Sequence, residues 1–172
     1  GRRKIWMVGG QAHHHDLGQK LAVQLVKQGL RVLVFCPSRV GAEKMLEGMR
    51  VSDGIPADQM EVYRAGLSSE QRSKIERGLK VGTTRLVFST SALELGIDIG
   101  QLDAVICVGL PSTMMSFWQR AGRVARGGRE GAIVLIPGNS PVETYYAQRP
   151  LEFFAKDHEP IAVNIDNEKI VS

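Results

Sequence analysis

A row of evenly spaced arginines is the part of this sequence whose residue types are best suited to chemistry. Arg120, Arg123, Arg126 and Arg129 follow one another at three-residue intervals, and the residues between them are mostly Ala, Gly and Val. An arginine side chain keeps its charge, and its planar fork grips phosphate oxygens in pairs. The segment therefore predicts contact with a polyphosphate. The kind of polyphosphate must be inferred from the elements that position the segment.

The composition is that of an ordinary globular domain. The chain has 172 residues, of which 43% are hydrophobic and 23% are charged, enough for one domain with a core. The formal net charge of +4 is compatible with a polyanionic partner without proving one. No apolar run approaches the roughly 18 residues of a membrane-spanning helix, and no signal-peptide pattern opens the chain. The first residue is Gly rather than Met, which indicates a processed or excised piece.

The two cysteines point to a reducing compartment. Cys36 and Cys107 are the only ones in the chain, and each lies in or beside an apolar run. Buried thiols without a metal or a disulfide are the simplest interpretation of this placement. We therefore expect an intracellular protein.

Short β-branched apolar runs alternate with helical segments along the chain. Buried strands are predicted over residues 31–35, 85–88, 104–108 and 132–136. Runs that are apolar on both sides suit a parallel sheet covered by helices on each face. The alternation predicts an α/β fold of three layers, with a mostly parallel central sheet flanked by helices.

Local signals predict where four helices begin or end. A helix over 16–28 stops at Gly29, and Ser38 begins a helix that runs to about residue 48. Ser68 and Gln71 form a capping box for a helix that ends near residue 80. Ser140 and Glu143 are predicted to form a second capping box, with a proline at the first helical position.

Polar residues follow three of the predicted strands at the point where each strand ends. Ser38 and Arg39 follow the first, Ser89 and Thr90 the second, and Ser112 lies just after the third. Ligands of open parallel sheets gather at the carboxyl ends of the strands. This edge is therefore the predicted location of the functional site.

Three segments, in this order and at this spacing, resemble motifs IV, V and VI of the superfamily 2 helicases. They are VLVFCPSR (32–39), STSALELGIDIG (89–100) and QRAGRVARGG (119–128). The second segment, SFWQRAGR (116–123) and the tail 150–171 are also similar to the MrfA-type DNA repair helicases, which are distant relatives of the RecQ enzymes. The chain departs from that family at Val124-Ala125, where Ala-Gly is more common, but the arginine spacing is unchanged.

The resemblance implies a RecA-like domain, the second of two in an ATP-dependent motor. That domain would occupy residues 1–149, and residues 150–172 would form an extension leading toward a further module. Arg123 and Arg126 match the arginines that reach the γ-phosphate of ATP bound on a partner domain. Gln119 matches a polar residue near that phosphate and the attacking water. Gly96 and Asp98 match residues that contact the nucleotide or link to the arginine segment.

A second set of residues matches positions that hold the nucleic-acid backbone. These are Ser38, Arg39, Gly66, Ser89 and Thr90. Hydroxyls and backbone amides at strand ends suit this role because they grip phosphates without reading sequence.

The chain lacks the parts that would bind the nucleotide phosphates by themselves. It contains neither a G-x-x-x-x-G-K-[ST] loop nor a DEAD-like acidic motif. Family members keep both in the first RecA-like domain, so ATP and Mg²⁺ would be bound mainly there and no metal site is expected in this chain. The implied partners are that domain of the same polypeptide and single-stranded or partly duplex DNA, with no membrane. The implied function is 3′→5′ DNA unwinding in repair. In a prokaryote the protein would be cytoplasmic and associated with the nucleoid. The 172-residue chain alone should be inactive.

Two alternatives to a DNA motor stay open at this point. The same motifs occur in motors that act on RNA, because they contact backbone rather than bases. A non-catalytic nucleic-acid-binding module would also keep the fold, but it has no use for Gln119, Arg123 and Arg126 together.

Several singled-out residues have simpler interpretations. Arg120 suits a structural salt bridge, Arg129 a solvated surface charge, and Trp118 a helix face packed on the sheet. The run 13–15 of three histidines suits a polar helix start, since no Cys or carboxylate cluster accompanies it.

Overall fold

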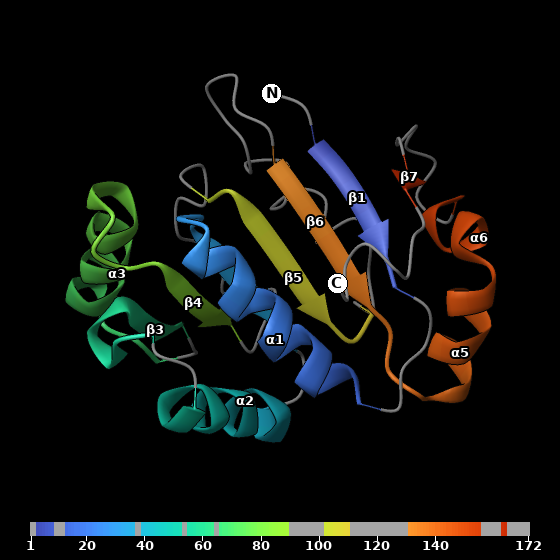
Figure 1. Ribbon diagram of the computed structural model, residues 1–172, viewed down its shortest axis with the longest axis horizontal. Coiled ribbons are helices and arrows are strands. Elements are labelled where there is room, and N and C mark those ends of the chain that lie inside the picture. Colours follow the sequence, from blue (N-terminus) through green and yellow to red (C-terminus); the bar gives the residue numbers. More distant parts are fainter. Residues whose placement is uncertain are drawn as a thin grey trace.

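A seven-stranded sheet in which every pairing is parallel organises the chain (Figure 1). The computed structural model describes residues 3–8, 13–36, 39–52, 55–63, 66–89, 102–110, 131–155 and 163–164. In chain order the elements are β1 (Arg3–Met7), α1 (His14–Lys27), β2 (Val32–Phe35), α2 (Arg39–Ser52), the 3-10 turn η1 (Ala57–Gln59), β3 (Met60–Tyr63), α3 (Ser69–Val81), β4 (Leu86–Ser89), β5 (Ala104–Val108), β6 (Gly131–Ile136), α5 (Pro141–Gln148), α6 (Pro150–Ala155) and β7 (Val163–Asn164). Across the sheet the strand order is β3-β4-β2-β5-β6-β1-β7.

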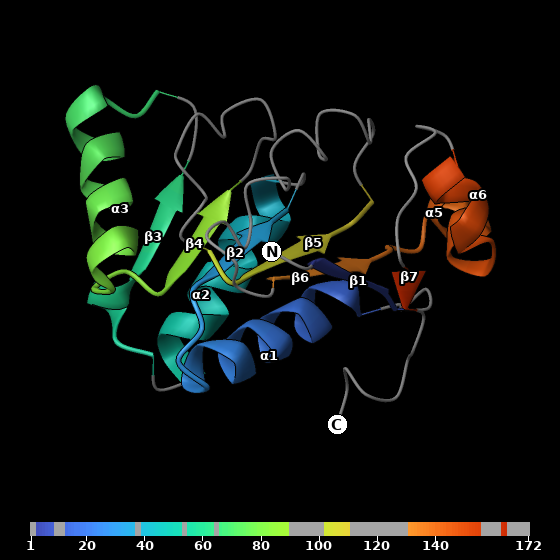
Figure 2. The same ribbon diagram turned by 90° about the horizontal axis from the view of Figure 1, so that it is seen from above.

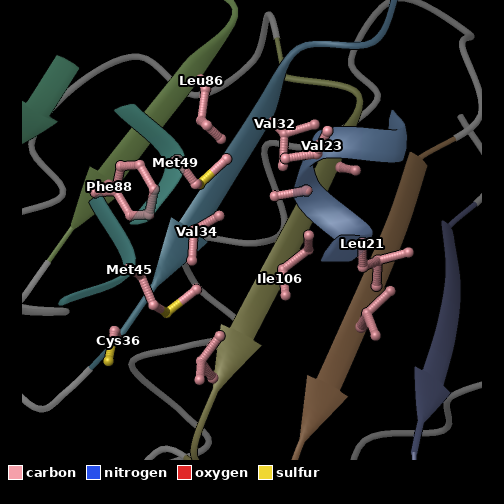
Figure 3. Close-up of a cluster of buried hydrophobic side chains, with 14 of the residues drawn as sticks. Leu21, Val23, Val32, Val34, Cys36, Met45, Met49, Leu86, Phe88 and Ile106 are labelled. Atoms are coloured by element: carbon pink, nitrogen blue, oxygen red, sulfur yellow. The ribbon is translucent and has the colours of Figure 1, made fainter. Parts of the chain in front are cut away.

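Helices cover both faces of the sheet, so the molecule has three layers (Figure 2). α1 and α2 pack on one face, where Val34, Phe88 and Ile106 belong to the core. Figure 3 shows this cluster, with Met45 and Met49 of α2 beside the sheet residues. On the other face α3 and α6 contribute Ile75, Leu79 and Phe153 to a second cluster. The predicted three-layer α/β fold with a parallel sheet is confirmed.

Strands buried on both faces are those that the sequence predicted most closely. Every residue of β2, β4 and β5 is buried. Such strands need apolar residues at successive positions, which makes them visible as continuous runs. The observed bounds differ from the predicted ones by one residue at most in these strands and in β6.

Two helix ends confirm the local signals. In α3 the Ser68 hydroxyl accepts a hydrogen bond from the Gln71 N–H at 3.2 Å, and the Gln71 amide oxygen accepts from the Ser68 N–H at 3.0 Å. Gly29 follows the C-cap residue of α1, and its φ of +87° is costly for residues with a Cβ. The N–H groups of Gly29 and Leu30 donate to the carbonyls of Val26 and Leu25, which satisfies the last turn.

Three strands and one α-helix were missed, and the end of α2 was predicted too early. β1 begins with two basic residues, β3 lies at an edge of the sheet and carries Glu61, and β7 has only two residues, so none forms a continuous apolar run. The short helix α6 was not predicted. α2 continues one turn past the predicted end because Met49 extends its buried face, and Gly48 makes room there for the Gln19 side chain.

Candidate functional site

The three motif-bearing segments leave the sheet from three neighbouring strands at one edge. β4, β2 and β5 lie side by side in that order. Their register aligns Ser89 with Phe35 and Phe35 with Cys107 in one row across the sheet. Residues 90–101 follow β4, residues 37–38 follow β2, and residues 111–130 follow β5 and Leu110. The order of strands in the sheet therefore brings the starting points of all three segments together.

Most of the predicted site residues lie outside the described residues. These are Ser38, Thr90, Gly96, Asp98, Gln119, Arg123 and Arg126. Arg39 is the first residue of α2, and Ser89 is the last residue of β4. Ser89 is fully buried, so its hydroxyl faces protein rather than solvent. The roles assigned to these residues stay predictions.

Gly66 lies in the turn after β3, close to the same row. The register aligns Tyr63 at the end of β3 with Ser89. Gly66 has a φ of +85°, and a Cβ built there would meet no atom within 4 Å. Its backbone is thus open to solvent, which is what the predicted backbone contact requires. The Arg72 guanidinium of α3 lies 6.0 Å from the centre of the Tyr63 ring.

A carboxylate that the sequence assigned to helix capping instead joins two loops. The Ser140 hydroxyl accepts from the Glu143 N–H at 3.2 Å, which confirms the first half of the predicted capping box. The second half was wrong, because the Glu143 side chain does not return to the Ser140 N–H. Its Oε1 accepts from the backbone N–H of Leu110 at 2.8 Å and of Gly138 at 3.1 Å, and its Oε2 accepts from the Ser140 hydroxyl at 2.8 Å. Leu110 follows β5 and Gly138 follows β6, so Glu143 ties together the exits of two strands.

The electrostatic setting of Glu143 favours the ionised carboxylate. Partial burial by itself raises the pKa of Glu143, but the Leu110 and Gly138 N–H groups, the Ser140 hydroxyl and the nearby His14 together outweigh this effect and lower it. Hydrogen bonds to an ionised acceptor are about twice as strong as neutral ones. Glu143 is therefore held as a charged group at the junction of the two loops.

Two of the three consecutive histidines, His14 and His15, are packed near Glu143 and the start of α2. The run is a helix start, as predicted: His13 is the exposed N-cap residue, and α1 begins at His14. His14 and His15 are half-buried, with ring centres 4.0 Å apart. His15 lies against Gly41 of α2 and His14 against Gly138. The buried His14 Nδ1 and His15 Nε2 atoms have no hydrogen-bond partner among the described residues, and burial, followed by the neighbouring His15, lowers the pKa of His14 despite Glu143.

We expect the free energy of unfolding to fall as the pH is lowered from 7.5. His14 has a lower pKa folded than unfolded, so the unfolded chain binds more protons once the pH drops below about 6.5, the ordinary value. Glu143 contributes stability above about pH 4.5, and this is lost as the pH falls through its lower folded pKa. Urea unfolding at a series of pH values measures both losses. His14→Asn should flatten the curve between pH 7.5 and 5.5, and an unchanged slope would contradict the assignment.

The family of the chain is shown by comparison with known proteins. A family model described as the helicase conserved C-terminal domain matches residues 15–128. The chain belongs to this helicase C-terminal domain family. The matched region begins in α1 and includes all three segments that resemble helicase motifs. The sequence prediction of a superfamily 2 helicase C-terminal domain is thus confirmed.

Relatives of this helicase C-terminal domain are much longer proteins. The chain is 36% identical over 150 residues to the ATP-dependent helicase YprA of Bacillus subtilis, and the match covers 86% of this chain and 20% of the relative. It is 38% identical over 136 residues to the ATP-dependent helicase HRQ1 of Saccharomyces cerevisiae, covering 76% of this chain and 13% of the relative. The chain thus spans a fifth or less of the length of these two curated relatives.

Solved structures of helicases share the fold. A crystal structure of the DUF1998 helicase MrfA bound to DNA and AMPPNP superposes with a TM-score of 0.76 at 32% identity, covering 96% of this chain and 24% of that one. The C-terminal domain of the DEAD-box protein Dbp5 superposes with a TM-score of 0.69 at 18% identity, covering 99% of this chain and 96% of that one. The second likeness concerns the fold alone, and it confirms the predicted RecA-like helicase C-terminal architecture.

Two further observations concern membranes and thiols. Among the described residues, no helix combines the length and the apolar character needed to cross a bilayer. Cys36 and Cys107 are buried thiols that form no disulfide, as expected. Burial also raises the pKa of Cys107 well above its ordinary value, so this thiol stays protonated and unreactive.

Proposed function

We propose that this chain is the second motor domain of an ATP-dependent DNA helicase or translocase. The observation that carries the proposal is the origin of three motif-bearing segments on the adjacent strands β4, β2 and β5. It is supported by the likeness to MrfA, a helicase whose structure was solved with DNA and the nucleotide AMPPNP. The named relatives YprA and HRQ1 are ATP-dependent helicases.

The proposed chemistry of this domain is the stabilisation of charge on the transferred phosphoryl group. Arg123 and Arg126 would reach the γ-phosphate of ATP across the cleft from the other RecA-like domain. Their guanidinium groups would neutralise the charge that develops during hydrolysis, a contribution of about 10³–10⁵ in rate for arginine fingers. Gln119 would orient the attacking water beside the same phosphate.

The floor of the ATP site would belong to the first RecA-like domain. Gly96 and Asp98 would approach the nucleotide from this chain, with Gly96 allowing close backbone contact. Mg²⁺ would neutralise the β- and γ-phosphates and would be bound by the first domain. Among the described residues, no group of three or more His, Cys, Asp or Glu side chains is suited to holding a metal ion.

The proposed nucleic-acid-binding surface lies along the same edge of the sheet, at the carboxyl ends of the strands. Ser38, Arg39, Gly66 and Thr90 would contact the phosphodiester backbone from the ends of β2, β3 and β4, whereas the fully buried Ser89 would lie behind this surface. ATP binding would close the two domains around the nucleotide, and hydrolysis would let them separate. Because both domains hold the same strand, each cycle would advance the motor along it.

DNA is the proposed substrate, and RNA is the second candidate. MrfA with DNA is 32% identical to this chain, whereas the Mss116p domain solved with an RNA duplex is 18% identical and shares only the fold. Movement in the 3′→5′ direction and a role in repair are extensions of the same proposal. A non-catalytic binding module is disfavoured by the combination of Gln119, Arg123 and Arg126.

The proposed domain boundary follows α5, with residues 1–149 as the motor domain and 150–172 as an extension toward a further module. α6 and β7 nevertheless contact the motor domain, because Phe153 is buried in its core and β7 pairs with β1. The extension would therefore begin as part of the same sheet. Buried thiols support work in a reducing, intracellular compartment.

We expect the 172-residue chain alone to hydrolyse no ATP and to bind single strands weakly. The parts of the ATP site on the other domain would be missing. The chain would also make only its own share of the contacts with the strand backbone, and this electrostatic binding would weaken further as the salt concentration rises. A colorimetric phosphate assay of the chain alone, and of a polypeptide that also carries the first RecA-like domain, tests this. Strand-stimulated turnover by the longer polypeptide only is the expected result. Robust turnover by the chain alone, abolished by Arg123→Ala, would contradict the division of the site between two domains.

The choice between DNA and RNA is decided with the longer polypeptide. Unwinding of a DNA duplex and of the corresponding RNA duplex, each with a 3′ overhang, is measured at the same salt concentration. Faster unwinding of the DNA duplex supports the proposal, and faster unwinding of the RNA duplex supports the second candidate.

A further inference from the structure

The start of the arginine-bearing segment is held by a network of backbone hydrogen bonds. Residues 111–130, which contain Gln119, Arg123 and Arg126, begin directly after Leu110 and end directly before β6. The chain leaves β5 through Gly109, whose φ is +95°. The Gly109 N–H donates to the Ile136 carbonyl at 2.8 Å, and the Cys107 thiol donates to the Gly109 carbonyl at 3.0 Å. The last contact before the segment is the Leu110 N–H, which donates to Glu143 at 2.8 Å.

Glu143 lies in the first turn of α5, and this helix is packed against the core. Its own N–H is bonded to Ser140 in the first turn of α5. One turn further, Tyr146 packs against the core, and its ring centre lies 5.3 Å from that of the fully buried Phe153 in α6. α5 follows β6 at the end of the sheet toward which the strand arrows point (Figure 1). The carboxylate is thus anchored both to the core and to the loop after β6.

We propose that Glu143 is a positioning residue, which sets the point from which the arginine-bearing segment leaves the sheet. This inference rests on the proposed function of Arg123 and Arg126 as arginine fingers. A single carboxylate oxygen accepts hydrogen bonds from the N–H groups of Leu110 and Gly138. It therefore fixes the positions at which the chain leaves β5 and β6 relative to each other. These two exits lie on neighbouring strands. A carboxylate is suited to this because it accepts several hydrogen bonds, and it pairs the N–H groups of both Leu110 and Gly138.

The consequence for turnover follows from how steeply catalysis depends on placement. A misplacement of about 1 Å, caused far from the chemistry, can cost on the order of 10² in rate. Loss of Glu143 frees the Leu110 N–H and lets the start of the segment move. The contacts of β2, β3 and β4 with a strand do not pass through Glu143, so strand affinity should not depend on it.

The test compares Glu143→Ala with Ser140→Ala in a polypeptide that carries both RecA-like domains. Ser140→Ala removes the cap of α5 and the contact to Oε2, but it leaves Leu110 and Gly138 on Oε1. It therefore serves as the matched control for simple loss of helix stability. Strand-stimulated kcat, KM for ATP, the Kd for a fluorescent DNA strand and the melting temperature are measured for both variants.

We expect Glu143→Ala to lower kcat about tenfold or more relative to the wild type and Ser140→Ala. KM for ATP and the strand Kd should stay within about threefold of the wild type. A decrease in melting temperature with kcat retained within twofold in both variants would overturn the positioning role. Equal losses in kcat and in strand affinity would also overturn it, because they would indicate general disruption of the fold.

Glu143→Gln decides the question if Glu143→Ala is not recovered as folded protein. Gln keeps the shape and one acceptor but not the charge, so we expect an intermediate decrease in kcat and faster hydrogen exchange at the Leu110 amide. Wild-type exchange and wild-type kcat in this variant would overturn the proposal. Arg123→Ala is assayed in parallel: its retention of turnover would refute the proposed function, whereas its loss of turnover with normal turnover in the Glu143 variants would refute only the positioning role.

Discussion

Replacing Arg123 by alanine in a polypeptide with both RecA-like domains should lower kcat for ATP by about 10³–10⁵, the range reported for arginine fingers. The affinity for a single strand should change by less than about threefold, because the proposed strand contacts come from β2, β3 and β4. Arg126→Ala should have an effect of the same kind. Steady-state phosphate release and fluorescence anisotropy with a labelled strand measure the two quantities separately.

Two further variants make this test specific. Arg123→Lys keeps the positive charge but loses the planar fork, so it should recover little of the lost turnover. Arg129→Ala changes an arginine of the same row that is predicted to be a solvated surface charge, and it should keep kcat within about twofold. Equal losses in Arg129→Ala and Arg123→Ala would show that the row acts through bulk charge, and the arginine-finger assignment would then be wrong.

Phe88→Ala should be the most destabilising single truncation in the core around α2, with a loss of about 3–5 kcal/mol in the free energy of unfolding. Phe88 is 1% exposed and lies among Val34, Met45 and Met49 (Figure 3). The cavity left by the ring is closed in by a strand and a helix, so neighbouring side chains cannot fill it fully. For a chain of this size the loss corresponds to a decrease of roughly 10 °C in melting temperature.

Urea unfolding of the wild type and the variant measures this loss, with Val81→Ala as the control. Val81 is 74% exposed at the end of α3, and its truncation should change stability by less than about 0.5 kcal/mol. Similar midpoints for Phe88→Ala and Val81→Ala would contradict the packing described for this face. Phe88 directly precedes Ser89, so the same variant should also loosen the start of the segment after β4.

The sequence predicted those parts of the fold that are set by local or uniform signals. β2, β4 and β5 need apolar residues on both faces, and the caps of α1 and α3 involve residues only a few positions apart. β3 and β7 were missed because an edge strand is half solvated or very short, and a neighbouring strand far along the chain decides whether it forms. α2 was predicted one turn too short because the glycine at 48 indicated an end, whereas packing of Met49 continues the helix.

For the candidate site, the sequence predicted an edge of the sheet and a set of roles, but not the contacts that hold its loops. The roles of Arg123, Arg126 and Gln119 come from the resemblance to helicases, since spacing alone indicates only a phosphate contact. Glu143 was assigned to its near neighbour Ser140, but its principal partner Leu110 lies 33 positions away in the sequence. No local pattern reveals such a contact. The same holds for His14, whose packing partner Gly138 lies in a distant loop.

The strand order also dictates when this domain can fold during synthesis. β2 is made early, but both of its partners, β4 and β5, are made much later, and β1 at the beginning of the chain waits for β6. Contacts between such distant segments slow folding and leave apolar strands exposed in the growing chain. The arginine-bearing segment lies between β5 and β6, so it is anchored at both ends only after β6 has been translated. A ribosome-bound chain that stops before β6 should therefore expose β2 and depend on chaperones, and the arginine-bearing segment should not be anchored in it.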